Sequence, residues 1–271
     1  EPPLAIDCAV TATWLEAFLR DEIVERRGIA RAVVALSGGV DSAVTAYLCA
    51  RALGPDNVHC IRMPYRTSSA DSLDDAQRVI DALGCHASTI PITPAVDGYL
   101  AMEPQAGPRR AGNVMARTRM LVLFDQSEKI GALPVGTGNK TERLFGYFTW
   151  HADDSPPVNP IGDLFKTQVW ALARFLGVPC TIIEKAPSAD LVVGQTDEAD
   201  LGISYEHADA ILSLLLTGYS DAQLAAGGYD AREIALVRGR VDGTHWKRHL
   251  PTTAMLSNTA INEFYLRPVD Y

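Results

Sequence analysis

The segment SGGVDS, at positions 37–42, combines two glycines, two hydroxyl side chains and one carboxylate directly after a short apolar run. Glycine lets the backbone approach a ligand closely, and the unpaired N–H groups at the start of a following helix favour a phosphate. Asp41 would repel that phosphate unless a cation lay between them, so the segment predicts a phosphate site with Mg²⁺. The alternative is a tight turn in which Asp41 only caps the helix.

Other phosphate-binding and catalytic signatures do not occur in the sequence. It contains no GxxxxGK[ST] loop, and GTGNKT at 136–141 falls short of the GxGxxG pattern of dinucleotide-binding folds. No Ser–His–Asp or Cys–His signature indicates a covalent nucleophile, so catalysis would depend on positioning and electrostatics. The five cysteines form no CxxC pair, which predicts buried reduced thiols; a zinc or disulfide framework is the alternative.

Length and composition narrow the class of protein. The 271 residues, 47% hydrophobic and 21% charged, are typical of a globular protein with one large domain or two small ones. A net charge of −9 disfavours a broad nucleic-acid or membrane-surface interface. No apolar run approaches the roughly 18 residues of a membrane span, and EPPLAIDCAV at the start does not form an intact signal peptide. We expect a cytoplasmic protein without nucleic-acid or membrane partners.

Short apolar runs alternate with amphipathic segments along the first half of the chain. Apolar residues at Val10, Trp14, Phe18 and Ile23 predict a first helix that ends near Gly28. The continuous apolar run at 32–36 is typical of a strand covered on both faces. Further strands are expected at 58–64, 86–92 and 132–139, and further helices at 41–54, 69–84 and 113–131.

This alternation predicts an α/β fold with a doubly wound, mostly parallel sheet flanked by helices. From Gly162 onward the pattern is mostly helical, and no repeat or linker divides the chain. We therefore expect a single domain over 1–271, with an α/β core at about 30–160 and a helical C-terminal elaboration at about 161–271.

The SGGxDS turn resembles the signature of the ATP-pyrophosphatase superfamily, which has an adenine-nucleotide alpha-hydrolase-like fold and activates a carbonyl or carboxyl oxygen as an adenylate. Further segments make the chain similar to the ammonia-dependent NAD synthetases, in order and spacing, from about residue 30 to about residue 251. These segments are IRMPYRTSS (61–69), NVMARTRM (113–120), GTGNKTE (136–142), NPIGDLFKTQVWALARFLGVP (159–179), PSADL (187–191), GQTDEADLGISYE (194–206) and KRHLP (247–251).

The resemblance implies a ligase reaction of NAD biosynthesis in two steps. ATP, as co-substrate, adenylates the nicotinate carboxylate of deamido-NAD and releases pyrophosphate. Ammonia then attacks the acyl adenylate, which releases AMP and NAD. Charge that develops on the phosphates requires cations and backbone donors, which the SGGVDS turn and Mg²⁺ would supply.

The resemblance also implies the roles of residues on the ATP side. Asp41 and Glu142 would hold Mg²⁺, and Lys166 would contact the ATP phosphates and act in catalysis. The alternatives are that Glu142 is a first-turn residue favoured by the helix dipole and that Lys166 is a solvated lysine. The full set of implied ATP contacts is Ser37, Gly38, Gly39, Val40, Asp41, Ser42, Arg62, Thr137, Lys166 and Ser188.

Arg117 matches the deamido-NAD contact of the family. It shares a helix face with Asn113, whereas Arg119, two residues on, points to nearly the opposite side and is expected to be structural. The loop at 149–160 would close over the site, and Asp153 would act in catalysis by binding or deprotonating ammonium. The alternative is a simple surface connection.

Three positions depart from the commoner family pattern, all on the deamido-NAD side. Trp150 replaces a lysine, Pro157 replaces an aspartate, and Trp246 precedes Lys247 where a histidine is usual. These four residues are the remaining expected substrate contacts. The indole rings could stack on a pyridine or adenine face.

Other members of the superfamily are the competing interpretations. A tRNA-modifying enzyme needs a basic face, which the net charge of −9 disfavours. Other amide-forming ligases do not share PSADL and LGISY, and a nucleotide sensor would not need two metal carboxylates. About 30 residues precede the first strand, so we expect no glutaminase domain and free ammonia as nitrogen donor. The resemblance also implies a homodimer.

Overall fold

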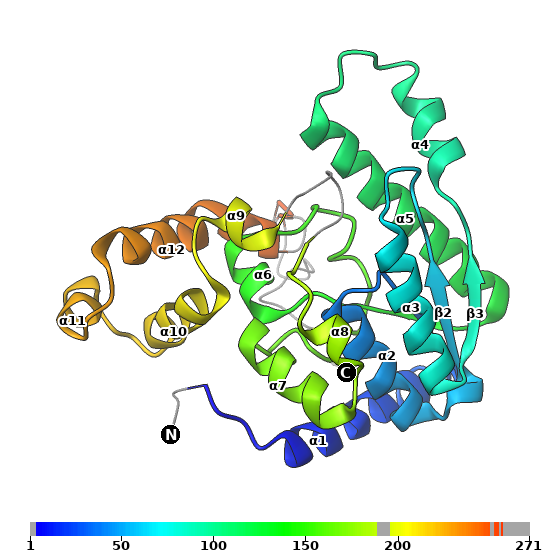
Figure 1. The fold of residues 1–271 in the computed structure, drawn as a ribbon, viewed down its shortest axis with the longest axis horizontal. Coiled ribbons are helices and arrows are strands. Elements are labelled where there is room, and N and C mark those ends of the chain that lie inside the picture. Colours follow the sequence, from blue (N-terminus) through cyan, green and yellow to red (C-terminus); the bar gives the residue numbers. More distant parts are fainter. Residues whose placement is uncertain (1–3, 189–195, 250–251, 255, 257–271) are drawn as a thin grey trace.

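A four-stranded sheet lies toward one side of the protein, away from the C-terminal helices (Figure 1). The computed structural model describes residues 4–188, 196–249, 252–254 and 256. The strands are β1 (Ala32–Ala35), β2 (Val58–Arg62), β3 (His86–Thr89) and β4 (Leu133–Val135), and their order across the sheet is β3-β2-β1-β4. All of these strand pairs are parallel, so the predicted doubly wound α/β fold is confirmed.

Helices connect the strands and continue after the last one. Those before β4 are α1 (Cys8–Arg20), α2 (Val40–Leu53), α3 (Ala70–Leu83), α4 (Thr93–Leu100) and α5 (Pro108–Ile130), with a π-helical turn η1 (Asp21–Glu25) and a 3₁₀ turn η2 (Pro55–Asn57). Those after β4 are α6 (Lys140–Phe145), α7 (Lys166–Leu176), α8 (Cys180–Ile183), α9 (Asp197–Leu201), α10 (Tyr205–Leu216), α11 (Asp221–Ala226), α12 (Ala231–Thr244) and the 3₁₀ turn η3 (His245–Arg248).

Two of these helices differ from the expectation. Sequence periodicity did not predict α4, a short helix that contains both Pro94 and Gly98. Helix α5 begins at Pro108, before the expected start at 113, because proline is well suited to the first helical position. The boundaries of α2 and α3 agree with the prediction within a residue or two, and the Ser69 side chain caps α3.

Apolar layers cover both faces of the sheet, since successive side chains of a strand point to opposite sides. Val34 of β1 belongs to a core cluster with α1, α2 and α7. Its neighbour Val33 belongs to a different cluster, with Met115 and Leu123 of α5. Burial on both faces explains why β1 reads as a continuous apolar run in the sequence.

The C-terminal helices pack around a third apolar cluster, and α10, α11 and α12 lie well away from the strands (Figure 1). Phe145 of α6, Tyr205 of α10 and Val237 of α12 are buried in this cluster. Trp170 of α7 contacts both this cluster and the one beneath α1 and α2. Helix α7 therefore joins the predicted helical elaboration to the sheet.

The loops after β1 and β4 meet at one end of the sheet. Strand β1 connects through α2 to β2 on one side, whereas β4 lies on its other side, so the order in which strands are added to the sheet reverses between β1 and β4. A crevice opens at the carboxyl ends of strands at such a switch point. The segments at 37–42 and 136–142 therefore come together, and Val158 adds a parallel bridge to Val135 at the same edge.

The cysteines are free thiols and do not form disulfides. Cys49, Cys60 and Cys85 are buried and Cys8 is half-buried, but Cys180 is exposed, so the expectation of buried thiols is wrong at that position. Its place at the start of α8, on the surface beside α7, explains that exposure. Among the described residues, none of the helices combines the length and the apolar character needed to cross a membrane.

Candidate functional site

Ser37 and Ser42 shape the turn after β1 through hydrogen bonds within it. The Ser42 hydroxyl accepts the Ser37 N–H at 3.2 Å and donates to the Gly39 carbonyl at 2.9 Å, while Ser37 Oγ accepts the Gly39 N–H at 3.2 Å. Helix α2 begins at Val40, and Gly39 at its N-cap has no side chain that could accept the first helical N–H groups. An anion can therefore take that place.

Gly38 is required by the close packing of this turn against α3. Its φ of +83° is a conformation that side-chain-bearing residues rarely adopt. A Cβ atom there would lie 2.1 Å from the Ser72 carbonyl oxygen. Any larger residue would push the turn away from α3 and change its shape.

Asp41, Glu142 and Lys166, which we call the inner cluster, meet beside this turn. The Lys166 ammonium binds the Asp41 carboxylate and lies 3.9 Å from Glu142 Oε1. Asn139 also donates to Asp41, with 3.1 Å between Nδ2 and Oδ1. The Asp41 carboxylate therefore faces residues of α6 and α7, and the alternative that it merely caps α2 is wrong.

Glu142 is held at the start of α6 by a capping box with Asn139. Asn139 Oδ1 accepts the Glu142 N–H at 2.9 Å, and Glu142 Oε2 accepts the Asn139 N–H at 3.2 Å. The other carboxylate oxygen, Oε1, faces Lys166. The same side chain can therefore stabilise the helix and take part in a cation site, so the two interpretations of Glu142 are compatible.

Lys166 is the first residue of α7, and its side chain is only 2% exposed, so it is not a solvated lysine. Burial opposes its charge, but the carboxylates of Asp41 and Glu142 outweigh that effect and raise its pKa above the ordinary value. Burial and the neighbouring Asp41 raise the pKa of Glu142 well above its usual range, and Lys166 opposes this shift. The three groups thus depend on one another for their charge states.

Asp197 and Tyr205, which lie in the segment GQTDEADLGISYE at 194–206, also surround the inner cluster. The sequence predicted no role for either residue. Asp197 is buried and accepts hydrogen bonds from Tyr205 at 3.1 Å and from Tyr147 at 3.2 Å. Burial raises its pKa, and Lys166 opposes that shift. The Lys166 ammonium also lies 5.4 Å from the centre of the Tyr205 ring. The place of Asp197 inside a segment that carries the family resemblance was the available signal.

Asp209 of α10 is another buried carboxylate that the sequence analysis did not single out. It accepts hydrogen bonds from Thr141 of α6 and Thr167 of α7, the neighbours in sequence of Glu142 and Lys166. Burial raises its pKa, and these hydrogen bonds oppose the shift. Its position gave no distinct signal, because a polar residue on an amphipathic helix is usually exposed.

The other expected ATP contacts differ in how far they are buried. Arg62 ends β2 and donates to Gln77 at 2.6 Å, and its buried Nε has no hydrogen-bond partner among the described residues. Thr137, after β4, is half-buried. Ser188 is exposed, and residues 189–191 of the PSADL motif lie outside the described residues. Val40 is buried in the core, so only its backbone faces the turn.

Arg117, Trp150, Asp153, Trp246 and Lys247 form a second group, which we call the outer cluster. Arg117 of α5 donates to the Trp150 carbonyl at 3.0 Å. The Trp150 and Trp246 rings meet edge to face, with centroids 5.2 Å apart. These contacts bring α5, the loop at 149–160 and η3 together, as the substrate prediction requires. Arg119 instead donates to the Met63 carbonyl at 3.2 Å, on the side toward β2.

Lys247 holds the chain just before this loop. Its ammonium donates to the carbonyls of Gly146 and Phe148, at 2.5 Å in each case, and lies over the Phe148 ring. Partial burial lowers its pKa, while Asp153 and Asp154 oppose that shift. Asp153 is exposed overall, but its carboxylate turns back to accept the Thr149 N–H at 2.8 Å. Desolvation raises the pKa of this carboxyl group to about 6, and the hydrogen bond from Thr149 opposes that shift.

The loop at 149–160 connects the outer cluster to the inner one. His151 has a φ of +57°, which is uncommon for a residue with a side chain, and its ring lies 4.0 Å from that of Trp150. At the other end of the loop, Asn159 donates to the Gly138 carbonyl at 2.8 Å, beside the capping box of α6. Pro157, between them, is exposed to solvent. The loop is thus anchored at both clusters.

Asp41 and Glu142 are the side chains of the site that could hold a metal ion. Mg²⁺ usually binds one or two carboxylates and completes its coordination with water and substrate phosphates. Two facing carboxylates beside the open start of α2 fit that requirement. Within the described part of the chain, no group of three or more His, Cys, Asp or Glu side chains is arranged to hold a metal by itself. A cation here would therefore be shared with a phosphate.

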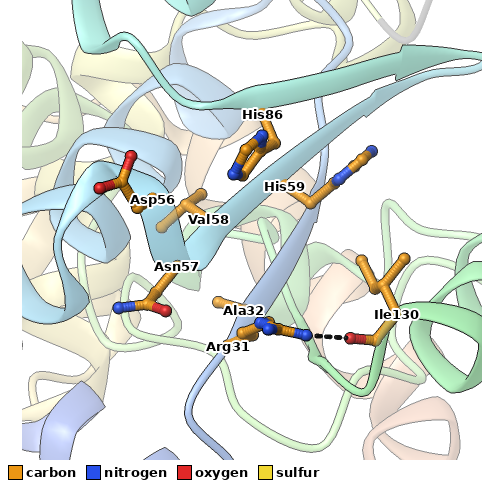
Figure 2. Close-up of a pocket in the computed structure, with 8 residues that line it drawn as sticks. All are labelled: Arg31, Ala32, Asp56, Asn57, Val58, His59, His86 and Ile130. Carbon is orange, nitrogen blue, oxygen red and sulfur yellow. Dashed lines mark hydrogen bonds between the residues drawn. The ribbon is translucent and has the colours of Figure 1, made fainter.

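A shallow hollow of about 210 Å³ lies at the opposite end of the sheet (Figure 2). Its lining includes Arg31, Asn57, His59 and His86 at the amino ends of the strands. Figure 2 shows that Arg31 donates to the Ile130 carbonyl, a contact of 3.0 Å, instead of pointing freely into the hollow. Ligands of open α/β sheets bind at the carboxyl ends of the strands, so this hollow is separate from the candidate site.

Comparison with known proteins agrees with this arrangement. The sequence profile of the family described as NAD synthase matches residues 11–251. An NH(3)-dependent NAD(+) synthetase of Trichlorobacter lovleyi is 46% identical over 260 residues, which cover 96% of this chain and 95% of that protein. The solved NMN synthetase of Francisella tularensis has a TM-score of 0.82 and 29% identity, and covers 92% of this chain and 99% of its own.

A second solved structure, the NH3-dependent NAD synthetase of Campylobacter jejuni, has a TM-score of 0.79 and 30% identity over 92% of this chain and 100% of its own. The matched residues include both the α/β core and most of the C-terminal helices. The profile, the sequence relative and both structures point to the same family. The chain belongs to the NAD synthase family.

Proposed function

We propose that the protein converts deamido-NAD to NAD with ATP and ammonia, through an adenylate of the nicotinate carboxylate. The observation that carries this proposal is the inner cluster: two carboxylates and one buried lysine beside an open helix start at the switch point of the sheet. A relative of nearly the same length is named for this reaction. A phosphate-binding turn without a covalent nucleophile suits an adenylation reaction.

In this proposal the SGGVDS turn and Lys166 bind the triphosphate. The first N–H groups of α2 donate to an α-phosphate oxygen, and Lys166 stabilises the negative charge that develops on the leaving pyrophosphate. Lys166 ion-pairs with Asp41, so nucleotide binding has to draw its ammonium toward phosphate. Arg62 offers a buried Nε–H without a partner among the described residues, which supports a role in binding the nucleotide. Thr137 and Ser188 would add hydroxyl donors.

Mg²⁺ is the proposed metal ion, held by Asp41 and Glu142 together with phosphate oxygens. When bound, it would neutralise part of the phosphate charge. The raised pKa of Glu142 supports this assignment, because a buried acidic pair without a cation between its members costs free energy. Lys166 partly supplies that cation in the free protein.

The outer cluster is proposed to bind deamido-NAD and to receive ammonia. Arg117 would pair with a phosphate of the dinucleotide, and Trp150 and Trp246 would offer faces to its rings. Pro157 and Lys247 would shape the same side of the site. Asp153 would bind ammonium and accept its proton before attack on the adenylate, since only neutral ammonia carries the lone pair for attack. The anchored loop would exclude water from the adenylate.

A homodimer is the proposed assembly. Leu121 and Phe124 are exposed on α5, 68% and 40% respectively, on the same helix as Arg117. A second copy that covered this face would remove the apolar side chains from water and would place the substrate site next to the interface. Sedimentation of the wild type and of Leu121→Lys would test this, with a monomeric variant as the expected result. A cytoplasmic location is also proposed, in keeping with the free thiols.

One assay tests the proposed function. The purified chain is mixed with ATP, Mg²⁺ and deamido-NAD, and receives either ammonium or glutamine. The proposal predicts equal amounts of NAD, AMP and pyrophosphate with ammonium and little product with glutamine. Absence of AMP under both conditions would refute it. AMP formation with a tRNA substrate instead would favour another member of the superfamily.

The likeness to an NMN synthetase supports one further arm of the same assay. Nicotinate mononucleotide carries the same carboxylate as deamido-NAD but lacks the adenylate half, so the inner cluster could activate either. The higher identity to a NAD(+) synthetase favours deamido-NAD. We expect a larger kcat/KM for the dinucleotide, and the reverse order would assign the chain to the mononucleotide.

A further inference from the structure

Helix α7 begins with Lys166, and Gln168 accepts the N–H of its N-cap residue Phe165 at 2.9 Å, but the N-cap cannot return a side-chain bond. Phe165 occupies the N-cap position and its side chain has no oxygen that could accept the first helical N–H groups. The Thr167 N–H is instead accepted by Asp209 Oδ2 of α10 at 2.9 Å, and the Thr167 hydroxyl donates to the same oxygen at 2.8 Å. Asp209 therefore caps α7 from another helix, 42 residues away in sequence.

The other oxygen of Asp209 reaches α6. Thr141 donates its hydroxyl to Asp209 Oδ1 at 2.5 Å, and the same hydroxyl oxygen accepts the Lys166 N–H at 3.1 Å. Thr141 immediately precedes Glu142, and Thr167 immediately follows Lys166. One carboxylate thus connects the backbone positions of two members of the inner cluster.

We propose that Asp209 is a positioning residue, which sets the relative place of Lys166 and Glu142 for the adenylation step. The inference rests on the proposed function, because it concerns the rate of that step. Asp209 is fully buried, and a buried carboxylate persists only where its oxygens are well hydrogen-bonded. A carboxylate suits this place, since it faces the positive end of α7 and accepts three hydrogen bonds.

Loss of this link would let α6 and α7 shift apart at the site. Lys166 would still be present, but its ammonium would no longer be fixed against the phosphates, and displacement by about 1 Å can cost about 100-fold in rate. We therefore expect Asp209→Ala to lower the rate of pyrophosphate release at saturating substrates by about 30- to 100-fold. The KM for deamido-NAD should change less than about threefold, because the hydrogen bonds of Asp209 go to α6 and α7 and not to the outer cluster.

Leu212→Ala is the matched control. Leu212 is buried on the same helix α10, one turn after Asp209, but its side chain is apolar and belongs to the C-terminal core cluster. Its truncation lowers thermal stability through a cavity and leaves the hydroxyls of Thr141 and Thr167 in place. Both variants are assayed well below their melting temperatures. A rate loss in Leu212→Ala as large as that in Asp209→Ala would overturn the inference, since general loosening of α10 would then suffice.

Two further variants keep the test decisive if Asp209→Ala does not fold. Asp209→Asn keeps an oxygen for Thr167 but removes the acceptor for the Thr141 hydroxyl proton, so we expect a loss of only about three- to tenfold. Thr141→Val removes the link between Asp209 and the Lys166 N–H, with about tenfold loss expected. Thr45→Val is its control, because the buried Thr45 hydroxyl has no hydrogen-bond partner among the described residues.

A double-mutant cycle separates positioning from an independent structural effect. If Asp209 acts through Lys166, Asp209→Ala should slow Lys166→Met by less than about threefold, although it slows the wild type much more. Equal fold-losses in both backgrounds would overturn the inference and leave the proposed function intact. If the wild type forms no AMP from ATP and deamido-NAD, the proposed function fails first, and the inference fails with it.

Discussion

The inner and outer clusters differ in what holds their charged side chains in place. In the inner cluster, Lys166 is buried against Asp41 and Glu142, so charged side chains satisfy one another. In the outer cluster, Arg117 and Lys247 donate to backbone carbonyls instead. The inner residues lie at helix starts around the sheet, whereas the outer residues, apart from Arg117 of α5, lie on a loop and a 3₁₀ turn.

This difference divides the proposed chemistry into two parts. Rigid groups that are held in place by opposite charges suit the stabilisation of charge that develops during adenylation. Aromatic and loop-borne groups suit recognition of a large substrate and its enclosure from water. We therefore expect inner substitutions to lower the rate of pyrophosphate release and outer substitutions to raise the KM for deamido-NAD or ammonium.

The largest effect is expected for Lys166→Met. Removing the buried ammonium leaves charge on the departing pyrophosphate without its protein partner, so kcat for AMP formation should fall by about 10³-fold. The KM for deamido-NAD should remain within a few-fold of the wild-type value. Lys129→Met, which alters an exposed lysine at the end of α5, should behave as the wild type. A near-normal kcat in Lys166→Met would contradict the role assigned to the inner cluster.

The next largest effect is expected for the two carboxylates of the inner cluster, because they are proposed to hold Mg²⁺. Asp41→Asn or Glu142→Gln should lower kcat by about 10²-fold and raise the Mg²⁺ concentration needed for half-maximal rate. A chelator should stop the wild-type reaction. Asp163→Asn changes a carboxylate whose side chain is 95% exposed and should leave the Mg²⁺ dependence unchanged. Equal Mg²⁺ dependence in all variants would remove these two residues as metal ligands.

Asp153→Asn should lower kcat/KM for ammonium, by about tenfold to 10²-fold, and leave the KM for ATP unchanged. In the wild type the active form is the ionised carboxylate, so kcat/KM for ammonium should fall as the pH drops through about 6. The asparagine variant should show only the decline that follows the fraction of neutral ammonia, without an added inflection near pH 6. Asp154→Asn, in the same loop, is the matched control, and an identical effect there would remove the special role of Asp153.

The raised pKa of Asp153 also predicts that Asp153→Asn increases stability, although it lowers activity. A carboxyl group whose pKa is higher in the folded state than in the unfolded one opposes folding once it is ionised. That cost develops as the pH rises from about 4 toward 6 and persists above it. The variant should therefore melt at a higher temperature than the wild type at pH 8 and show no such advantage at pH 4. A lower melting temperature at pH 8 would argue that the Thr149 contact stabilises the loop.

The smallest effect is expected for the two indole rings. Stacking of a base on an aromatic side chain contributes about 1–3 kcal/mol, so Trp150→Ala or Trp246→Ala should raise the KM for deamido-NAD by about tenfold. The KM for ATP should not change. Trp14→Ala removes a ring of α1 that is 67% exposed, and serves as the control. Unchanged KM values in both outer variants would show that the rings pack only on each other.

The sequence predicted the sheet well because each strand is a short segment followed by a turn or helix signal, although β3 is polar and mostly exposed. The family resemblance implied that Asp41 and Glu142 share a metal ion, and the structure brings both carboxylates to Lys166 at the carboxyl ends of neighbouring parallel strands. The sequence pattern missed α4, where proline and glycine obscured the helical period. It also missed Asp197, although that residue lies in a segment that carries the family resemblance, and Asp209, whose hydrogen-bond partners Thr141 and Thr167 are distant in sequence.

Prediction of the outer cluster was less complete for a physical reason. Arg117, Trp150 and Trp246 come from three separate segments, and no periodic pattern relates them. The contact of Lys247 with the carbonyls before the loop depends on the fold of η3 against α6 and could not be derived from spacing. Their substrate roles remain predictions, whereas their proximity is a property of the fold.

The adenylate is the central claim, and isotope transfer tests it most directly. Deamido-NAD labelled with ¹⁸O in its nicotinate carboxylate is converted with unlabelled ATP, Mg²⁺ and ammonium, and the AMP is analysed by mass spectrometry. The account predicts that one labelled oxygen per turnover passes from the carboxylate to the phosphate of AMP. Product NAD with unlabelled AMP, or with label in released inorganic phosphate, would contradict it.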